Sequence, residues 1–171
     1  MKILITGGAG FVGVRLARAL LQRGTLAGRA LRQVVLADQA TPPADLLAEA
    51  RVQARVGPLL AHCDALRDET FDGVFHLASA VSGECEADFD LGLRSNLDST
   101  RALLNALRYR QGQGQGAAPA RLVFSSSVAV FGPDPAVPMP SVVADDTLPT
   151  PQTSYGTHKL ICEHLVADYT R

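Results

Sequence analysis

Tyr155 and Lys159 are the two residues of this sequence whose types and spacing point most directly to chemistry. Residues four apart on an α-helix lie on the same face, so the phenol and the ammonium would be neighbours. A positive charge fixed beside a phenol stabilises the phenolate, which lets a tyrosine exchange a proton near neutral pH. Such pairs also occur on the surface of ordinary amphipathic helices. The interpretation of this pair therefore depends on the rest of the chain.

The residues before this pair predict how it is positioned. Ser125–Ser127 follow a predicted strand at Arg121–Phe124, and open α/β sheets bind ligands at the carboxyl ends of their strands. One of the three hydroxyls is expected to orient a substrate. Residues 132–152 are rich in proline and long enough to form a wall of an active site. Thr153–Ser154 are predicted to cap the helix that carries Tyr155.

A glycine-rich turn near the N-terminus predicts a nucleotide-binding site. The apolar run Lys2–Thr6 is typical of a buried parallel strand, and it leads into Gly8, Gly10 and Gly13, which fit the pattern G-x-G-x-x-G. In that pattern the glycines allow a tight turn, close approach to a pyrophosphate and close packing of the next helix. The phosphates would lie at the N-terminus of that helix, which is predicted to end at Gly24.

Asp38 bears on the choice of cofactor. It ends the apolar run Gln33–Ala37, where a carboxylate can accept hydrogen bonds from both ribose hydroxyls of an adenosine. The same carboxylate would repel a ribose 2′-phosphate, and no Arg or Lys immediately follows to offset the repulsion. This favours NAD over NADP. The alternative is a solvated aspartate at a strand end, preceded by an extended loop at Thr25–Arg32.

The remaining apolar patterns predict alternating strands and helices. We expect a helix at Ala44–Ala50, a third strand at Arg51–Val56, a fourth strand at Gly73–Ala80, a long helix at Glu84–Arg110 and a surface loop at Gln111–Gly116. This order is typical of an α/β fold with a doubly wound parallel sheet of the Rossmann type. Asp64 is a candidate to contact an adenine amino group, and His76 is expected in the core. Asn96 would be either a structural clamp or part of a proton relay.

The composition excludes several classes of function. The chain has 171 residues, 47% hydrophobic and 19% charged, and a formal net charge of -1, so neither nucleic acid nor a membrane surface is an expected partner. No apolar run is long enough to span a membrane. Its 3 cysteines are widely spaced and lack a histidine at metal-ligand spacing. We therefore expect reduced thiols, no metal and a cytoplasmic protein.

Taken in order, these motifs resemble the extended short-chain dehydrogenase/reductase family, also called the NAD-dependent epimerase/dehydratase family. The resemblance covers residues 2–171 and implies an NAD-dependent enzyme in which Tyr155 exchanges the proton, Lys159 holds the nicotinamide ribose and Ser127 bonds the reacting oxygen. The cofactor contacts that it implies, besides Tyr155 and Lys159, are Gly7, Gly8, Gly10, Phe11, Val12, Gly13, Asp38, Asp64, Leu77, Ala78, Ser79 and Asn96. It also implies a homodimer that pairs the helices near Leu97–Leu107 and Tyr155–Asp168.

More narrowly, Phe124–Gly132 and Pro149–Gly156 resemble a branch of the family that oxidises the C2 hydroxyl of a four-carbon sugar acid. A sugar-nucleotide 4-epimerase or dehydratase is the second interpretation, although Phe131 stands where sugar-nucleotide epimerases usually have tyrosine. His158 lies within the catalytic spacing, at a position that the family leaves variable.

The length of the chain raises a question of its own. We expect one NAD-binding domain over residues 1–171, incomplete at its C-terminus because five strands are predicted and no substrate domain follows. A fragment of a longer enzyme is the favoured explanation. The others are a naturally short NAD-binding module without catalysis and a chain that completes its core by self-association.

Overall fold

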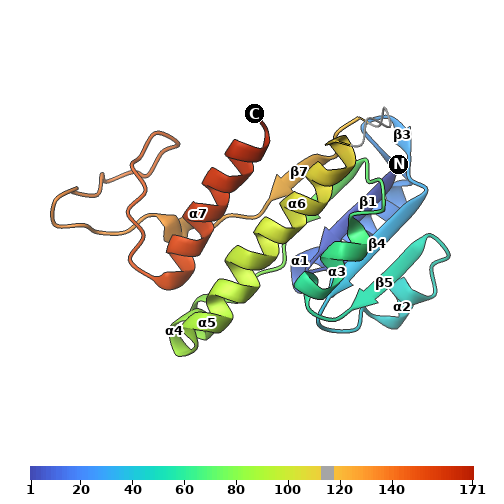
Figure 1. The fold of residues 1–171 in the computed structure, drawn as a ribbon, viewed down its shortest axis with the longest axis horizontal. Helices are drawn as coiled ribbons and strands as arrows, with labels where there is room; N and C mark the ends of the chain where they lie inside the picture. The colour runs from blue at the N-terminus through green and yellow to red at the C-terminus, as the bar shows by residue number, and fades with distance from the viewer. Residues whose placement is uncertain (113–117) are drawn as a thin grey trace. The chain divides into compact units, whose positions relative to one another are not determined.

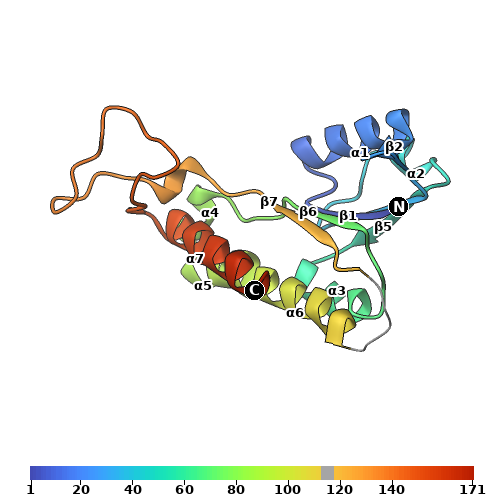
Figure 2. The ribbon, with the colours of Figure 1, turned by 90° about the horizontal axis from the view of Figure 1, so that it is seen from above.

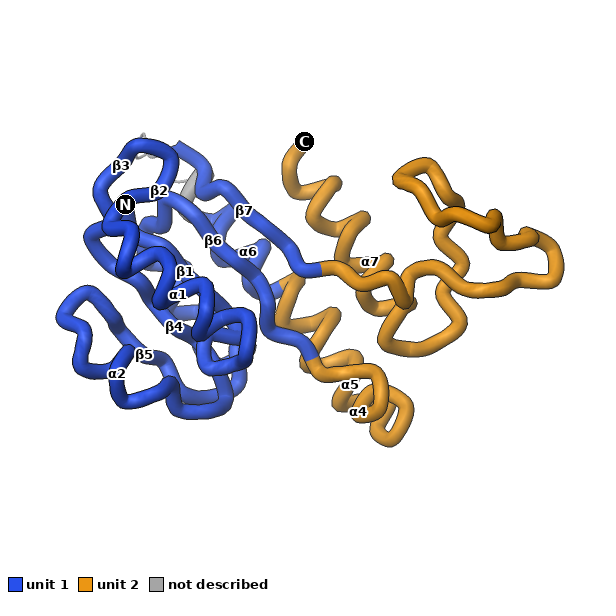
Figure 3. The backbone as a smooth tube through the Cα atoms, turned by 180° about the vertical axis from the view of Figure 1, so that it is seen from behind, with its two compact units in different colours: residues 1–79, 102–125 blue, residues 80–101, 126–171 orange. Residues whose placement is uncertain are grey.

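The computed structural model describes residues 1–112 and 118–171, so most of the predicted loop at Gln111–Gly116 lies outside the described residues. The chain forms two units, coloured separately in Figure 3. Unit 1 contains Met1–Ser79 and Ala102–Ser125, and unit 2 contains Ala80–Arg101 and Ser126–Arg171. Each unit is described by itself.

Unit 1 is built on a parallel sheet. Its strands, in the order that they occupy in the sheet, are β5 (Val52–Val56), β4 (Gln33–Asp38), β1 (Lys2–Thr6), β6 (Gly73–His76) and β7 (Arg121–Phe124). Every neighbouring pair is parallel. The order places β1 at the centre, with the chain running outward to β5 before it crosses to β6. This confirms the predicted Rossmann-type fold class and the five predicted strands, although the fourth ends at His76 and not at Ala80.

Helices cover both faces of this sheet, as Figures 1 and 2 show. Helix α1 (Phe11–Arg23) lies on one face, and α3 (Leu59–Leu66) lies on the other with the Ala102–Gly112 part of α6 (Ser99–Gly112). Alternate residues of β1 point to opposite faces of the sheet. Ile3 and Ile5 pack on the side of α1, and Leu4 packs on the side of α3 and α6. A parallel sheet buried on both faces needs such uninterrupted apolar strands.

Three local predictions in unit 1 differ from the structure. The predicted extended loop at Thr25–Arg32 contains an antiparallel hairpin of β2 (Thr25–Leu26) and β3 (Arg29–Ala30). It turns at Ala27 and Gly28, which both have positive φ, and Ala27 carries no sequence signal for that conformation. Helix α2 (Ala44–Leu47) is shorter than predicted. Helix α3 was not predicted at all.

Unit 2 is mainly helical. It contains α4 (Ser82–Ala87), α5 (Phe89–Gly92), the π-helical segment η1 (Leu93–Asp98), the start of α6, the short 3₁₀ segment η2 (Val128–Val130) and α7 (Ser154–Tyr169). The prediction of one helix at Glu84–Arg110 is therefore wrong. The chain breaks at Asp88, whose backbone is extended and whose side chain caps α5 by accepting a hydrogen bond from the Leu91 amide at 2.9 Å.

Among the described residues, no helix combines the length and the apolar character that crossing a lipid bilayer requires.

Candidate active site

The glycine turn of unit 1 lies between the carboxyl end of β1 and the start of α1. Gly7 has φ +71, and its amide donates to the carbonyl oxygen of Ala37 at the end of β4, at 2.8 Å. A Cβ at Gly13 would overlap the carbonyl oxygen of Gly7, so α1 can begin this close to the turn only if residue 13 is glycine. Glycine is thus required at two positions for different reasons, at Gly7 by the positive φ and at Gly13 by the close packing.

The start of α1 suits an anion. Its first turn contains no acidic residue, the side chains of Phe11 and Val12 are exposed, and the Arg15 guanidinium lies 5.8 Å from the centre of the Phe11 ring. The first amides of a helix have no intrahelical acceptor and carry partial positive charge. The pyrophosphate of a dinucleotide fits this chemistry, and the backbone of Gly10–Gly13 is the part of unit 1 that would hold it.

Asp38 ends β4 and connects two loops at the carboxyl edge of the sheet. One carboxylate oxygen accepts a hydrogen bond from the Ala9 amide at 2.9 Å, and the other accepts one from the Ala40 amide at 3.0 Å. A carboxylate has lone pairs for about four hydrogen bonds, so it retains capacity for the ribose hydroxyls. Asp38 therefore braces the glycine turn and keeps lone pairs that can accept further hydrogen bonds at this edge of the sheet.

The segment after β6 lies directly against the glycine turn. The Ala78 amide donates to the Thr6 hydroxyl at 3.2 Å, and a Cβ at Gly7 would lie 2.9 Å from the Ala78 nitrogen. The structure thereby brings Leu77 and Ala78 to the turn, with Ser79 next in the chain. His76 is buried as predicted, with Nδ1 2.6 Å from the Thr6 hydroxyl.

Asp64 does not lie at the edge of the sheet. It is an exposed residue within α3, whereas Gly57 and Pro58 are the residues that follow β5 at its carboxyl end. The sequence analysis missed α3 and so placed Asp64 in a loop. The geometry gives no support to an adenine contact from this residue.

Asn96 is a clamp in unit 2. Its side-chain oxygen accepts from the Ala80 amide at 2.7 Å, and its side-chain nitrogen donates to the Ala80 carbonyl at 3.3 Å and to the Cys85 sulfur at 3.3 Å. The Cys162 thiol of α7 donates to the Asn96 carbonyl at 3.5 Å. Of the two roles that the sequence left open, these contacts support the clamp.

Tyr155 and Lys159 lie one turn apart on α7, which Thr153 caps by accepting a hydrogen bond from the Gly156 amide at 3.0 Å. The Lys159 ammonium lies 5.6 Å from the centre of the Tyr155 ring. Lys159 is only 3% exposed, and this burial lowers its pKa, although the nearby thiols of Cys162 and Cys85 act in the opposite direction. A buried cation next to a phenol is the arrangement that the spacing predicted.

Ser127 lies in extended backbone just before η2. Its hydroxyl oxygen accepts a hydrogen bond from the Ala129 amide at 3.1 Å. Because a serine hydroxyl has one donor and two acceptor sites, this bond fixes the oxygen and leaves the proton available for donation. A reacting hydroxyl or carbonyl oxygen is a suitable acceptor.

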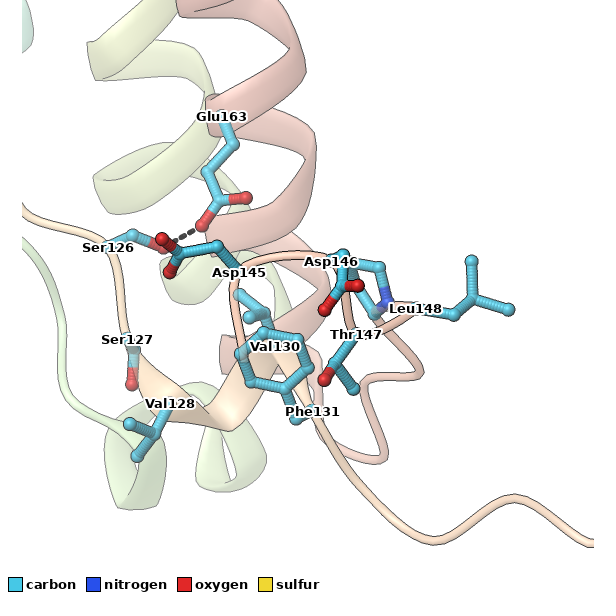
Figure 4. Close-up of a pocket in the computed structure, with 11 residues that line it drawn as sticks. Ser126, Ser127, Val128, Val130, Phe131, Asp145, Asp146, Thr147, Leu148 and Glu163 are labelled. Atoms are coloured by element: carbon cyan, nitrogen blue, oxygen red, sulfur yellow. Dashed lines mark hydrogen bonds between the residues drawn. The ribbon is translucent and has the colours of Figure 1, made fainter. Parts of the chain in front are cut away.

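A cavity of about 670 Å³ opens beside Ser127 in unit 2, and Figure 4 shows the residues that line it. Ser126 and Ser127 form one side. Asp145–Pro149, from the proline-rich loop, form another, so this loop supplies a cavity wall as expected. Glu163 of α7 also lines the cavity and accepts a hydrogen bond from the Ser126 hydroxyl. The sequence analysis missed Glu163, although it continues the i, i+4 row of Tyr155 and Lys159.

His158 belongs to the packed interior of unit 2. It is 2% exposed, its ring centre lies 6.3 Å from that of Phe89, and its Nδ1 has no hydrogen-bond partner among the described residues. Burial lowers the pKa of His158 and so favours the neutral ring, whereas the nearby Glu86 charge has the opposite, smaller effect. Within the described part of the chain, no group of three or more His, Cys, Asp or Glu residues is arranged to hold a metal ion.

A parallel sheet with a glycine turn after its first strand, together with a Ser, Tyr and Lys set, defines a Rossmann-type protein of the short-chain dehydrogenase class. The profile of the NAD dependent epimerase/dehydratase family matches residues 3–171, and the chain belongs to this family.

One curated relative and two solved structures show what the chain is similar to. D-erythronate dehydrogenase of Cupriavidus necator is 48% identical over 100% of this chain and 51% of its own length. The crystal structure of a nucleoside-diphosphate-sugar epimerase from Agrobacterium tumefaciens is similar with a TM-score of 0.90 and 42% identity, over 100% of this chain and 49% of that one. UDP-glucose 4-epimerase from Brucella ovis in complex with NAD is similar with a TM-score of 0.75 and 28% identity, over 99% of this chain and 47% of that one. The chain thus spans about half the length of the curated relatives that it matches.

Proposed function

We propose that this chain is the NAD-binding and proton-transferring part of an oxidoreductase that oxidises a secondary hydroxyl of a D-erythronate-like sugar acid. The observation that carries the proposal is the buried Lys159 ammonium beside the Tyr155 ring, on a chain that belongs to an NAD-dependent family. The 48% identity to D-erythronate dehydrogenase supports the substrate class. We assign residues 1–171 to one NAD-binding domain, with the substrate domain outside this chain.

The proposed cofactor contacts follow the geometry of each unit. In unit 1, the backbone of Gly7, Gly8 and Gly10–Gly13 would hold the pyrophosphate, Asp38 the adenosine ribose, and Leu77–Ser79 would line the same edge of the sheet. In unit 2, Tyr155 and Lys159 would contact the nicotinamide ribose, while Asn96 supports their helix from behind. Asp64 is left out of this proposal because it lies within α3.

The proposed chemistry is a proton transfer that accompanies hydride removal. Bound NAD supplies the hydride acceptor. The substrate hydroxyl lies between Ser127 and Tyr155, where the Ser127 hydroxyl donates a hydrogen bond to the reacting oxygen. Tyr155, as the phenolate that Lys159 stabilises, takes the hydroxyl proton as the carbon loses its hydride. The alcohol thereby becomes a carbonyl, and the phenol regains its proton.

Cofactor binding is the first test. Titration calorimetry with NAD and NADP should show binding of NAD with a clear preference, because the Asp38 carboxylate would repel a 2′-phosphate. Asp38→Ala should weaken NAD binding by about tenfold or more, since it removes both the ribose acceptor and the brace on Ala9. If the wild-type chain binds NADP as tightly as NAD, the assigned role of Asp38 is wrong.

Turnover separates the candidate functions. Oxidation of D-erythronate should produce NADH, which is measured by its absorbance at 340 nm. The 42% identity to a nucleoside-diphosphate-sugar epimerase favours sugar-nucleotide epimerisation as the second candidate, which would convert UDP-glucose without net NADH. NAD binding without either reaction would indicate a non-catalytic module. Each assay should use this chain beside a version extended through the downstream reading frame.

We also propose a cytoplasmic homodimer whose interface uses the helices near Leu97–Leu107 and Tyr155–Asp168. Exposed apolar side chains support this surface, because Phe89 is 59% and Ile161 38% exposed and both line one hollow with Leu93 and His158. Free, buried cysteines fit a reducing compartment. Light scattering at high concentration should find a dimer, and a monomer there would contradict the proposal.

A further inference from the structure

The two serines before η2 have different partners. Ser126 donates its hydroxyl proton to the Glu163 carboxylate, and Figure 4 shows its side chain pointing toward Glu163 on α7. Side chains alternate along extended backbone, so the Ser127 hydroxyl points away from Glu163. Ser126 is therefore anchored to the helix, while its neighbour is the residue that the proposed reaction uses.

A second contact holds this segment to the same helix on the other side of Ser127. A Cβ at Gly156 would overlap the carbonyl oxygen of Ala129, so the first turn of α7 packs directly on the backbone there. The amide of the same Ala129 donates to the Ser127 hydroxyl oxygen. Ser127 thus lies between two anchor points on α7, one at Ser126 and one at Ala129.

These anchors matter because the reacting groups come from separate segments. Tyr155 and Lys159 belong to α7, whereas Ser127 has extended backbone just before η2. The distance between the serine and tyrosine hydroxyls therefore depends on how firmly that segment is held to the helix. A hydrogen bond to a charged carboxylate is stronger than one between neutral groups, which suits it to this task.

We propose that Glu163 is a positioning residue, which acts through Ser126 to hold the Ser127 hydroxyl in place relative to Tyr155. The inference rests on the proposed function, because it assigns Ser127 to the reacting oxygen. Glu163 touches neither substrate nor cofactor in this role. The Ser126–Glu163 hydrogen bond joins two side chains and can therefore be removed by substitution, whereas Gly156 packs on the backbone of Ala129.

The first test is kinetic and uses a form of the protein that turns over substrate. Ser126→Ala and Glu163→Leu should each lower kcat by about 100-fold, as expected for a displacement on the order of 1 Å, while KM changes little. Glu163→Gln should recover most of kcat, because its amide oxygen can still accept the serine proton. Asp168→Leu removes an exposed carboxylate from the same helix and should leave kcat unchanged. Wild-type kcat in both Ser126→Ala and Glu163→Leu would overturn the proposal.

Amide exchange provides a test that does not need turnover. In the 171-residue chain, Ser126→Ala and Glu163→Leu should speed exchange of the Ala129 amide by about tenfold or more, and Glu163→Gln should not. A residue that merely stabilises α7 would instead speed exchange along that helix. Unchanged protection of Ala129 in both variants would refute the anchoring. If the wild type turns over none of the candidate substrates, the proposed function fails, and this measurement still decides the anchoring.

Discussion

The Lys159 ammonium lies 5.6 Å from the centre of the Tyr155 ring, one helical turn further along α7. This is within the roughly 6 Å over which a cation interacts with an aromatic face. Lys159 reaches that position while almost fully buried, so the charge is poorly screened by water. While Lys159 is protonated, its charge therefore acts on the phenol with less dependence on ionic strength than a surface ion pair shows.

Tyr155→Phe should abolish turnover in a form of the protein that turns over substrate. The substitution removes the hydroxyl that exchanges the proton and leaves the ring that Lys159 approaches. NAD affinity, measured by titration, should stay within about threefold of wild type, since the proposed pyrophosphate and adenosine contacts all belong to unit 1. Tyr169→Phe, on the same helix, is the matched control. A Tyr155→Phe variant that keeps more than about a tenth of the wild-type kcat would refute the assigned role.

Lys159→Met should change how stability depends on pH. Burial lowers the pKa of Lys159 below its unfolded value of 10.5, so between the two values the unfolded chain binds more protons than the folded chain. The free energy of unfolding therefore rises with pH in that window, and falls as pH drops through the folded pKa. The variant lacks this contribution.

Urea unfolding of both proteins across alkaline pH measures the difference directly. The stability of wild type relative to Lys159→Met should increase as pH approaches 10.5, because the substitution removes the ammonium group whose pKa burial lowers. A constant difference across this range would show that burial does not perturb Lys159.

The three free cysteines should resist thiol reagents in the folded chain. Cys63, Cys85 and Cys162 are buried, and burial raises the pKa of each thiol, that of Cys63 to about 11. With a pKa of about 11, roughly one thiol in a thousand is ionised at pH 8, and the thiolate is the reactive form. A colorimetric thiol assay at pH 8 should detect all 3 cysteines in denaturant and almost none without it. Rapid labelling of the native protein would contradict this burial.

The sequence was sufficient to predict the central strands because their apolar signal is uninterrupted. Lys2–Thr6 and Gln33–Ala37 contain continuous apolar runs, and a strand buried on both faces needs such a run. Helix α3 was missed for the opposite reason, since it is amphipathic over only 8 residues and begins after Gly57-Pro58. The break at Asp88 was missed because leucines at helical spacing continue beyond it, while the capping side chain of Asp88 starts a separate helix, α5.

The candidate site was only partly predictable for a related reason. Motif spacing indicates which residues share a helix face, as it does for Tyr155 and Lys159. It does not indicate contacts between segments far apart in the chain, such as Ser126 with Glu163, 37 residues later. Asn96 shows the same limit, because its partner Ala80 lies 16 residues earlier and only the fold decides between clamp and relay.

Gly13→Ala should disrupt the proposed pyrophosphate site. The new Cβ would overlap the carbonyl oxygen of Gly7, so the turn must move away from the start of α1. We expect a loss of about 1–3 kcal/mol in the free energy of unfolding, as is usual for an overpacked buried site, together with loss of detectable NAD binding.

Gly83→Ala is the matched control, because Gly83 is an exposed residue of α4 and a Cβ there would meet no atom within 4 Å. That substitution should stabilise the chain by up to about 1 kcal/mol, since alanine favours helix over glycine, and leave NAD affinity unchanged. Chemical unfolding and titration calorimetry on the two variants measure both effects. Wild-type NAD affinity in Gly13→Ala would show that the close approach of α1 to the turn does not form the phosphate site.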